Sequence, residues 1–175
     1  MRRLILFRHA KSDWSEEGLD DHVRPLNARG KRVAGPMGAW LTGRGFRPDL
    51  VLCSTAKRAR ATWDLAKVAL TPAPKATFDP ELYMASAATL LAKVKELPAE
   101  IQTVLIVGHN PGLEQFVKLV ASKGDPEARR ALSEKFPTAA IAVIDFPFDD
   151  WSQIKPDAGR LDRFVTPRSL GLGEA

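Results

Sequence analysis

The sequence predicts an α/β fold: a three-layer sandwich with a mostly parallel central sheet, helices on both of its faces and an antiparallel edge. The first observation is three short apolar runs, at residues 4–7, 50–53 and 104–107. Continuous apolar runs without alternation are typical of strands buried on both faces. The second observation is that segments with helical spacing follow these runs, and regular alternation of strand and helix favours a parallel sheet.

The first strand leads into a polar segment, residues 10–22, that we expect to be a loop. Asn27 is expected to cap the helix that follows. The apolar face of this helix is predicted to consist of Val33, Met37, Trp40 and Leu41. Pro36 lies inside the same pattern, and we expect it to kink or restart the helix, because proline removes a backbone hydrogen bond.

The remaining elements are expected in the following order: a strand at 50–53, a helix over 58–68, a weaker strand over 76–78, a helix over 87–94, a strand at 104–107, a helix over 113–120, and strands over 139–146 and 161–165. No long helix separates the last two strands, which indicates a hairpin or an antiparallel edge. No internal repeat or long linker divides the chain, so we expect a single domain over residues 1–175.

The composition, 45% hydrophobic and 27% charged, is that of a soluble globular protein. Cys53 is the only cysteine, which excludes an intramolecular disulfide and fits a reducing compartment. The first apolar run is too short for an export segment or a membrane span, so we expect a cytoplasmic protein without membrane association. The net charge of +5 suits anionic ligands, but the basic residues are scattered, so nucleic acid is not an expected partner.

Three strand-to-helix junctions each carry a group that suits phosphate. The first offers Arg8 and His9, the second Ser54 and Arg58, and the third His109. The carboxyl ends of parallel strands share one edge of a sheet, where ligands bind, so these side chains are expected to converge. Arg58 also lies in the first turn of its helix, where backbone N–H groups favour an anion. The sequence therefore predicts a pocket for a phosphoryl group.

Other kinds of phosphate or metal site fit the sequence poorly. Four residues separate Cys53 from Arg58 and six separate it from Arg60, and neither spacing suits a cysteine phosphatase. The glycine-rich loops of nucleotide-binding folds are absent from the sequence. The three histidines lack metal-ligand spacing, and His22 is expected at the surface.

Five motifs along nearly the whole chain carry a resemblance to a known family. They are, in order, Arg8-His9-Ala10, Arg24-Pro25-Leu26 with Gly30, the set Ser54, Arg58, Ala59 and Thr62, then Gly108-His109, and residues 138–142. This set resembles the histidine phosphatase superfamily, which includes cofactor-dependent phosphoglycerate mutase. It resembles most the small branch of SixA-type phosphohistidine phosphatases. Ala10 stands where the signature of the superfamily has glycine.

The resemblance implies a phosphoglycerate mutase-like fold and a phosphatase that needs no metal and no cofactor. It implies that His9 is the nucleophile and is transiently phosphorylated, with Arg8, Arg58 and His109 around the phosphoryl group. These roles agree with chemistry: a neutral imidazole is a competent nucleophile, and fixed cations stabilise the charge on the equatorial oxygens of the transition state. Arginine suits this task because its planar fork binds two oxygens.

Two positions depart from the wider superfamily. Glu81 lies about where many members have a general acid, but a solvated loop residue is the favoured interpretation, because the role of the acid in the short branch is doubtful. Ser12 and Ser15 lie in a loop that differs from that of the mutases. Ser15 is a candidate phosphate ligand, although loop serines more often only shape turns.

Two classes of function remain open from the sequence. The first is an enzyme that hydrolyses phosphohistidine on a protein, such as a phosphotransfer protein, with a phosphatase of small phosphate monoesters as its variant. The short chain favours the protein substrate, because no insertion is long enough to roof the pocket. The second is a module that binds phosphohistidine or phosphate with little turnover. The sequence leaves the oligomeric state open, and a monomer is compatible with it.

Overall fold

The computed structural model describes residues 1–174. Its strands are β1 (Arg2–Arg8), β2 (Leu50–Ser54), β3 (Lys75–Asp79), β4 (Thr103–Gly108), β5 (Lys123–Gly124), β6 (Ile141–Phe146) and β7 (Arg160–Val165). Its α-helices are α1 (Ala28–Gly43), α2 (Lys57–Ala66), α3 (Ala87–Lys95), α4 (Gly112–Val120) and α5 (Pro126–Glu134). Of the 3₁₀ helices, η1 (Asp21–Val23), η3 (Pro80–Leu82) and η5 (Arg168–Leu170) bear on the site. Within these residues, no helix combines the length and the apolar character needed to cross a membrane.

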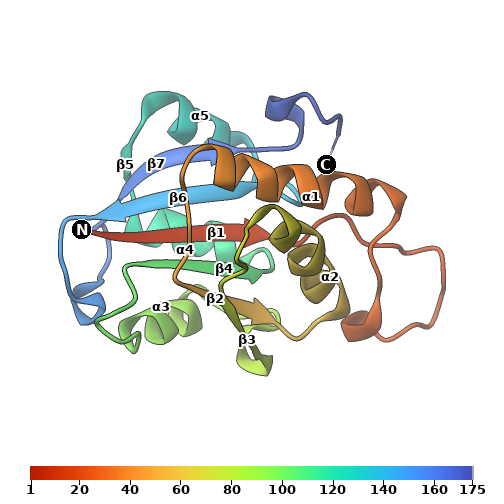
Figure 1. Ribbon diagram of the computed structural model, residues 1–175, viewed down its shortest axis with the longest axis horizontal. Coiled ribbons are helices and arrows are strands. Elements are labelled where there is room, and N and C mark those ends of the chain that lie inside the picture. Colours follow the sequence, from red (N-terminus) through yellow and green to blue (C-terminus); the bar gives the residue numbers. More distant parts are fainter. Residues whose placement is uncertain (175) are drawn as a thin grey trace.

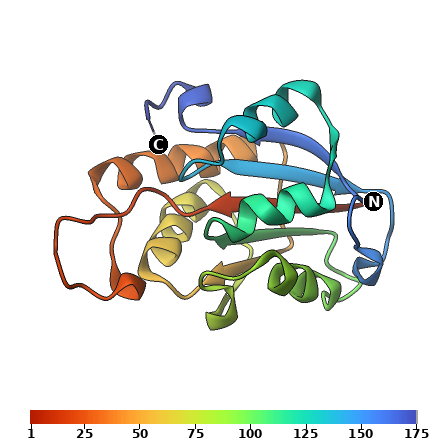
Figure 2. The same cartoon turned by 180° about the vertical axis from the view of Figure 1, so that it is seen from behind.

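The strands form one seven-stranded sheet in the order β3-β2-β4-β1-β6-β7-β5 (Figure 1). Strands β3, β2, β4 and β1 are mutually parallel, and β6 runs antiparallel to both β1 and β7. Helices α1 and α2 cover one face of the sheet, and α3, α4 and α5 cover the other (Figures 1 and 2). The predicted α/β sandwich, its mostly parallel sheet and its antiparallel side are confirmed.

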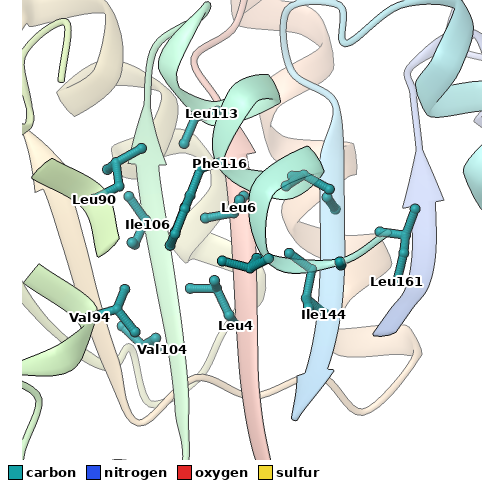
Figure 3. Close-up of a cluster of buried hydrophobic side chains, with 14 of the residues drawn as sticks. Leu4, Leu6, Leu90, Val94, Val104, Ile106, Leu113, Phe116, Ile144 and Leu161 are labelled. Atoms are coloured by element: carbon teal, nitrogen blue, oxygen red, sulfur yellow. The ribbon is translucent and has the colours of Figure 1, made fainter. Parts of the chain in front are cut away.

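Strand β1 contributes to two cores at once. Leu4 and Leu6 pack against α3 and α4 on one face, as Figure 3 shows for that cluster. Ile5 and Phe7 pack against α1 and α2 on the other face. All four side chains are fully buried. Successive side chains of a strand point to opposite faces, so a strand covered on both faces must be apolar at every position.

Helix α1 begins as predicted, because the Asn27 side chain accepts a hydrogen bond from the Gly30 backbone N–H at 2.8 Å. It does not restart at Pro36, contrary to one of the predicted outcomes, but continues to Gly43. The buried residues Val33 and Met37 on either side of Pro36 pack against the sheet. We attribute the continuity of the helix to this packing, which offsets the roughly 3 kcal/mol that an internal proline costs.

Helix α5 is absent from the sequence-based prediction. Its signals are local ones: Asp125 caps the helix by accepting from the Ala128 N–H at 2.9 Å, and Pro126 occupies its first turn. Only Ala128 and Leu132 of this helix are buried. With so few apolar positions the helix shows little periodicity, and periodicity was the signal that located the other helices.

Candidate active site

The floor of the site is built where three neighbouring parallel strands end. Arg8 at the end of β1 is in register with Gly108 at the end of β4, so His9 and His109 emerge side by side. Their ring centroids lie 5.1 Å apart. Strand β2 pairs with the other edge of β4 and leads into α2, which carries Arg58. The structure thus brings together side chains that are about a hundred positions apart in the sequence.

The ring of His9 is oriented by its own backbone. Its Nδ1 lies 2.7 Å from the carbonyl oxygen of Ala10, and because a carbonyl only accepts, Nδ1 carries the proton. The Ala10 N–H donates to Thr62 Oγ1 at 2.9 Å, which fixes this turn against α2. The lone pair of His9 Nε2 is therefore left facing the Arg58 Nε, at 3.4 Å. An imidazole held in this way is suited to nucleophilic attack.

Both imidazoles are neutral at pH 7. Burial, together with the nearby Arg58 and Arg8, lowers the pKa of His9 to about 4, although its contact with the Ala10 carbonyl opposes the shift. Burial, followed by His9 and Arg58, lowers the pKa of His109 to about 3. Desolvation disfavours the charged form of a histidine, and neighbouring cations add to the effect. The nucleophilic form of His9 is therefore populated at neutral pH.

Arg58 is held in one position by contacts on several sides. Its side chain is almost fully buried and donates to the Asp21 backbone oxygen at 2.7 Å and to the Asp21 carboxylate at 3.0 Å. The same guanidinium lies 3.4 Å from His9 Nε2 and 3.4 Å from His109 Nδ1. A fixed cation between two imidazoles requires no reorganisation when an anionic group arrives.

Ser54 fixes the second imidazole. Its Oγ lies 2.8 Å from His109 Nε2 and also accepts from the Ala56 backbone N–H at 3.2 Å. Because the Arg58 guanidinium only donates, the facing His109 Nδ1 accepts, and His109 Nε2–H donates to Ser54. A hydroxyl can also donate to that nitrogen, which would place the proton of His109 on Nδ1 instead.

Arg8 forms one side of the pocket. One of its terminal nitrogens donates to the Phe136 backbone oxygen at 2.8 Å, an oxygen that also accepts from the Asn110 side chain at 3.1 Å. Its Nε is buried and has no hydrogen-bond partner among residues 1–174. The residues around this pocket of about 510 Å³ are Arg8, His9, Lys11, Ser12, Trp14, Asp21, Arg58, Met84, Asn110 and Thr138.

Two functional residues were missed by the sequence analysis, Asp21 and Tyr83. The Asp21 carboxylate accepts from both the Tyr83 hydroxyl and Arg58. The hydrogen bond from Tyr83 contributes most to lowering the pKa of Asp21, and Arg58 adds to it. This carboxyl is therefore ionised at neutral pH. The available signal was the acidic pair Asp20-Asp21 in a loop that follows the first motif, but the sequence does not show which loop carboxylate turns inward.

Glu81 and Ser15 lie apart from His9. The Glu81 carboxylate is 68% exposed, pairs with Lys93 of α3 at 2.6 Å and does not line the pocket. Lys93 also binds Asp79, which caps η3, so this ion-pair cluster holds Glu81 outside. Ser15 is exposed and does not line the pocket, and its backbone N–H donates to Asp13.

Three other predicted positions have clear surroundings. Ser12 lines the pocket, and its Oγ accepts from the Trp14 indole N–H at 2.9 Å. His22 is half-buried rather than at the surface, since its Nε2 lies 2.9 Å from Thr55 Oγ1 and its ring packs edge-on against Tyr83. Cys53 is fully buried, and burial raises its thiol pKa to about 12, which leaves the thiol protonated. In the part of the chain that the structure describes, no cluster of three or more His, Cys, Asp or Glu side chains could hold a metal ion.

Comparisons with known proteins point to one family. The sequence profile of the histidine phosphatase superfamily (branch 1) matches residues 4–83. The uncharacterized protein Rv1276c of Mycobacterium tuberculosis is 39% identical over 163 residues, which cover 92% of this chain and 99% of that protein.

Solved structures extend this similarity to the whole fold. A protein provisionally assigned as the phosphohistidine phosphatase SixA of Agrobacterium tumefaciens superposes with a TM-score of 0.78 and is 33% identical, over 95% of this chain and 99% of that one. The protein histidine phosphatase SixA in complex with tungstate superposes with a TM-score of 0.77 over 96% of this chain and 99% of that one. Because the two sequences are only 24% identical, this match is evidence for the shared fold alone.

Proposed function

This chain belongs to the SixA-type branch of the histidine phosphatase superfamily, and we propose that it hydrolyses phosphohistidine on a protein substrate through a phosphohistidine intermediate on His9. The phosphatase class follows from the family. The proposal adds the substrate and the residue roles. It is supported by the contacts among His9, Arg58 and His109: the Arg58 guanidinium lies between the two imidazoles, and His9 and Arg58 line the pocket.

In the first step, His9 Nε2 attacks the phosphorus atom, and the bond between phosphorus and the imidazole nitrogen of the substrate breaks. Arg8 and Arg58 bind the equatorial oxygens, on which the charge of the transition state is spread. For this step His109 takes its other tautomer: the Ser54 hydroxyl rotates to donate to His109 Nε2, and His109 Nδ1–H donates to a third oxygen instead of accepting from Arg58. The phosphoryl group then resides on His9 Nε2, with the proton of Nδ1 retained, and the imidazole of the substrate, which carries a proton on its other ring nitrogen, leaves as the neutral ring.

In the second step, a water oxygen attacks the phosphorus atom and the bond to His9 Nε2 breaks. Inorganic phosphate leaves as H2PO4⁻ with the oxygen and both protons of the water, and His9 Nε2 regains its lone pair. Splitting the displacement in two lets one set of fixed cations stabilise two similar transition states.

The main support for phosphohistidine as the substrate is the ionised form of the carboxylate in the pocket. Among the described residues, Asp21 is the only carboxylate that lines the pocket, and Tyr83 and Arg58 keep it ionised. An ionised carboxylate is a poor proton donor. An alkoxide leaving group needs a strong general acid, whereas an imidazole leaves more readily. The pocket therefore suits a phosphoramidate better than an alkyl phosphate.

The mouth of the pocket also suits a flat leaving group. Trp14 and Met84 are 63% and 50% exposed, and both line the same pocket as His9. Arg24 stacks on the Trp14 ring at 4.0 Å, and Ser12 holds its indole N–H, so this exposed ring has a fixed position. Exposed apolar side chains gathered at one site are typical of a binding surface.

The test compares turnover of a phosphohistidine peptide, a sugar phosphate and p-nitrophenyl phosphate by the wild-type protein and by His9→Ala. We expect the highest kcat/KM on the phosphohistidine peptide and no labelled phosphate trapped on His9→Ala. Preference for the sugar phosphate would favour a monoester phosphatase. Binding of the phosphopeptide without turnover would favour a binding module.

A further inference from the structure

A second cavity of about 600 Å³ adjoins the catalytic pocket. Arg8, Lys11 and Thr138 line both, so the two spaces share one wall. The rest of its lining comes from the start of α1, the end of α5 and the segment that contains η5. In Figures 1 and 2 the segment that contains η5 lies beside α1, and Leu170 and Leu172 of this segment pack against the core that α1 contributes to.

The lining of this cavity is strongly basic. We define the basic groove by four cations, Lys11, Arg29, Lys135 and Arg168, which lie beside Arg8. Two carboxylates, Glu134 and Glu174, line it as well. Within residues 1–174, no carboxylate lies within 4.0 Å of the charged atoms of Lys11, Arg29 or Lys135.

Within the described residues, Arg168 has one ion pair, and it is a loose one. Its guanidinium lies 3.9 Å from Glu174, and both side chains are largely exposed. Exposed pairs at this distance contribute little to stability, so an incoming anion can replace Glu174 at little cost. The groove is therefore a concave surface with more cations than carboxylates. The excess positive charge produces a positive electrostatic potential that attracts an anionic ligand.

Continuity with the catalytic pocket indicates which ligand the groove serves. A phosphate monoester of a small alcohol would occupy only the space beside His9. A ligand that reaches the groove must extend from the phosphoryl group past Arg8 toward Arg168, and must carry further negative charge. A protein chain with acidic residues beside its phosphohistidine meets both conditions.

We propose that the basic groove, formed by Lys11, Arg29, Lys135 and Arg168, binds an acidic segment that flanks the phosphohistidine of the protein substrate. The inference rests on the proposed function and adds to it the sequence context that the enzyme selects. Charge complementarity of this kind raises the association rate and fixes the register of a docked chain.

The test removes groove cations that the catalytic pocket does not share. Lys135→Gln/Arg168→Gln is compared with Lys75→Gln/Lys123→Gln, which removes two exposed lysines that line neither cavity. The substrates are two phosphohistidine peptides, one flanked by Asp and Glu and one by Ser and Gly. We expect the groove variant to raise KM for the acidic peptide about tenfold at low salt, with kcat unchanged. We expect no change for the neutral peptide, and none in the control variant.

Binding separates this inference from the proposed function. Fluorescence anisotropy of the acidic peptide without its phosphoryl group reports on the groove even if the enzyme does not hydrolyse phosphohistidine. Equal affinity for wild type and Lys135→Gln/Arg168→Gln would overturn the groove proposal. So would tighter competition by inorganic tripolyphosphate than by the acidic peptide, which would assign the groove to a small polyphosphate ligand.

Discussion

The floor and the wall of the catalytic pocket are built in different ways. The floor consists of His9 and Arg58, which line the pocket, and of His109, which contacts Arg58 without lining the pocket; the three are 7%, 4% and 3% exposed. The wall includes Trp14 and Asp21 from the loop between β1 and α1, and both are accessible to solvent. The floor is rigid because the sheet fixes it, whereas the wall depends on a few contacts made by a loop.

This difference ranks the consequences of mutation. Floor residues, and Arg8 at the side of the pocket, touch the phosphoryl group directly in the proposed mechanism, so their loss removes transition-state stabilisation. Wall residues orient a floor residue or contact the leaving group, so their loss has smaller and more selective effects.

The largest effect is expected from Arg58→Ala. Removing a fixed cation aimed at the transition state is expected to lower kcat by about 10²–10³-fold. Arg58→Lys is the matched control: it keeps the charge but loses the planar fork, and is expected to recover only part of the rate. Steady-state kinetics on the phosphohistidine peptide measure kcat for both variants. Circular dichroism verifies that they are folded. Wild-type kinetics in a folded Arg58→Ala protein would remove Arg58 from the site.

The sequence predicted the floor and missed most of the wall, for a physical reason. His9, Ser54, Arg58 and His109 were found because apolar runs locate buried strands, and parallel strands end at one edge. Asp21 and Tyr83 were missed because a loop has no periodicity from which the direction of a side chain follows. Glu81 was chosen by its position in the chain, but Lys93 holds it outside the pocket.

The same contrast holds for the fold. The sequence located the long buried strands and most helices, because burial on two faces leaves a continuous apolar run and burial on one leaves a helical period. It left α5 unassigned, since that helix buries only Ala128 and Leu132. It allowed a restart at Pro36 that the structure does not show, because tertiary packing overrode a local preference.

The floor also makes stability depend on pH. The pKa values of His9 and His109 are about 4 and 3 in the folded protein, below the value of 6.5 for a histidine exposed to solvent. Between these values the unfolded chain binds more protons than the folded one, so the free energy of unfolding falls as the pH drops from about 6.5 toward 4. Urea denaturation at several pH values measures this slope. His109→Gln is expected to make the slope shallower, and an unchanged slope would show that His109 is not held neutral by burial.

A smaller effect is expected from Asp21→Asn in the wall. Losing the negative charge beside Arg58 loosens that guanidinium, and we expect kcat to fall about tenfold. If Asp21 only positions Arg58, the loss is equal for a phosphohistidine peptide and for an alkyl phosphate. A loss confined to the alkyl phosphate would instead identify Asp21 as the general acid. Tyr83→Phe removes the hydroxyl that donates to Asp21 and is expected to lower kcat by a smaller factor.

The smallest effect is expected from Trp14→Ala, which changes only the mouth of the pocket. Losing the fixed ring is expected to raise KM for the phosphohistidine peptide about threefold to tenfold, because stacking on a flat leaving group contributes roughly 1 kcal/mol. Inhibition by inorganic phosphate is expected to stay unchanged, because phosphate contacts the floor alone. Val68→Ala removes another largely exposed apolar side chain, one that does not line the pocket, and serves as the control. A change in phosphate inhibition by Trp14→Ala would show that the wall and the floor are coupled.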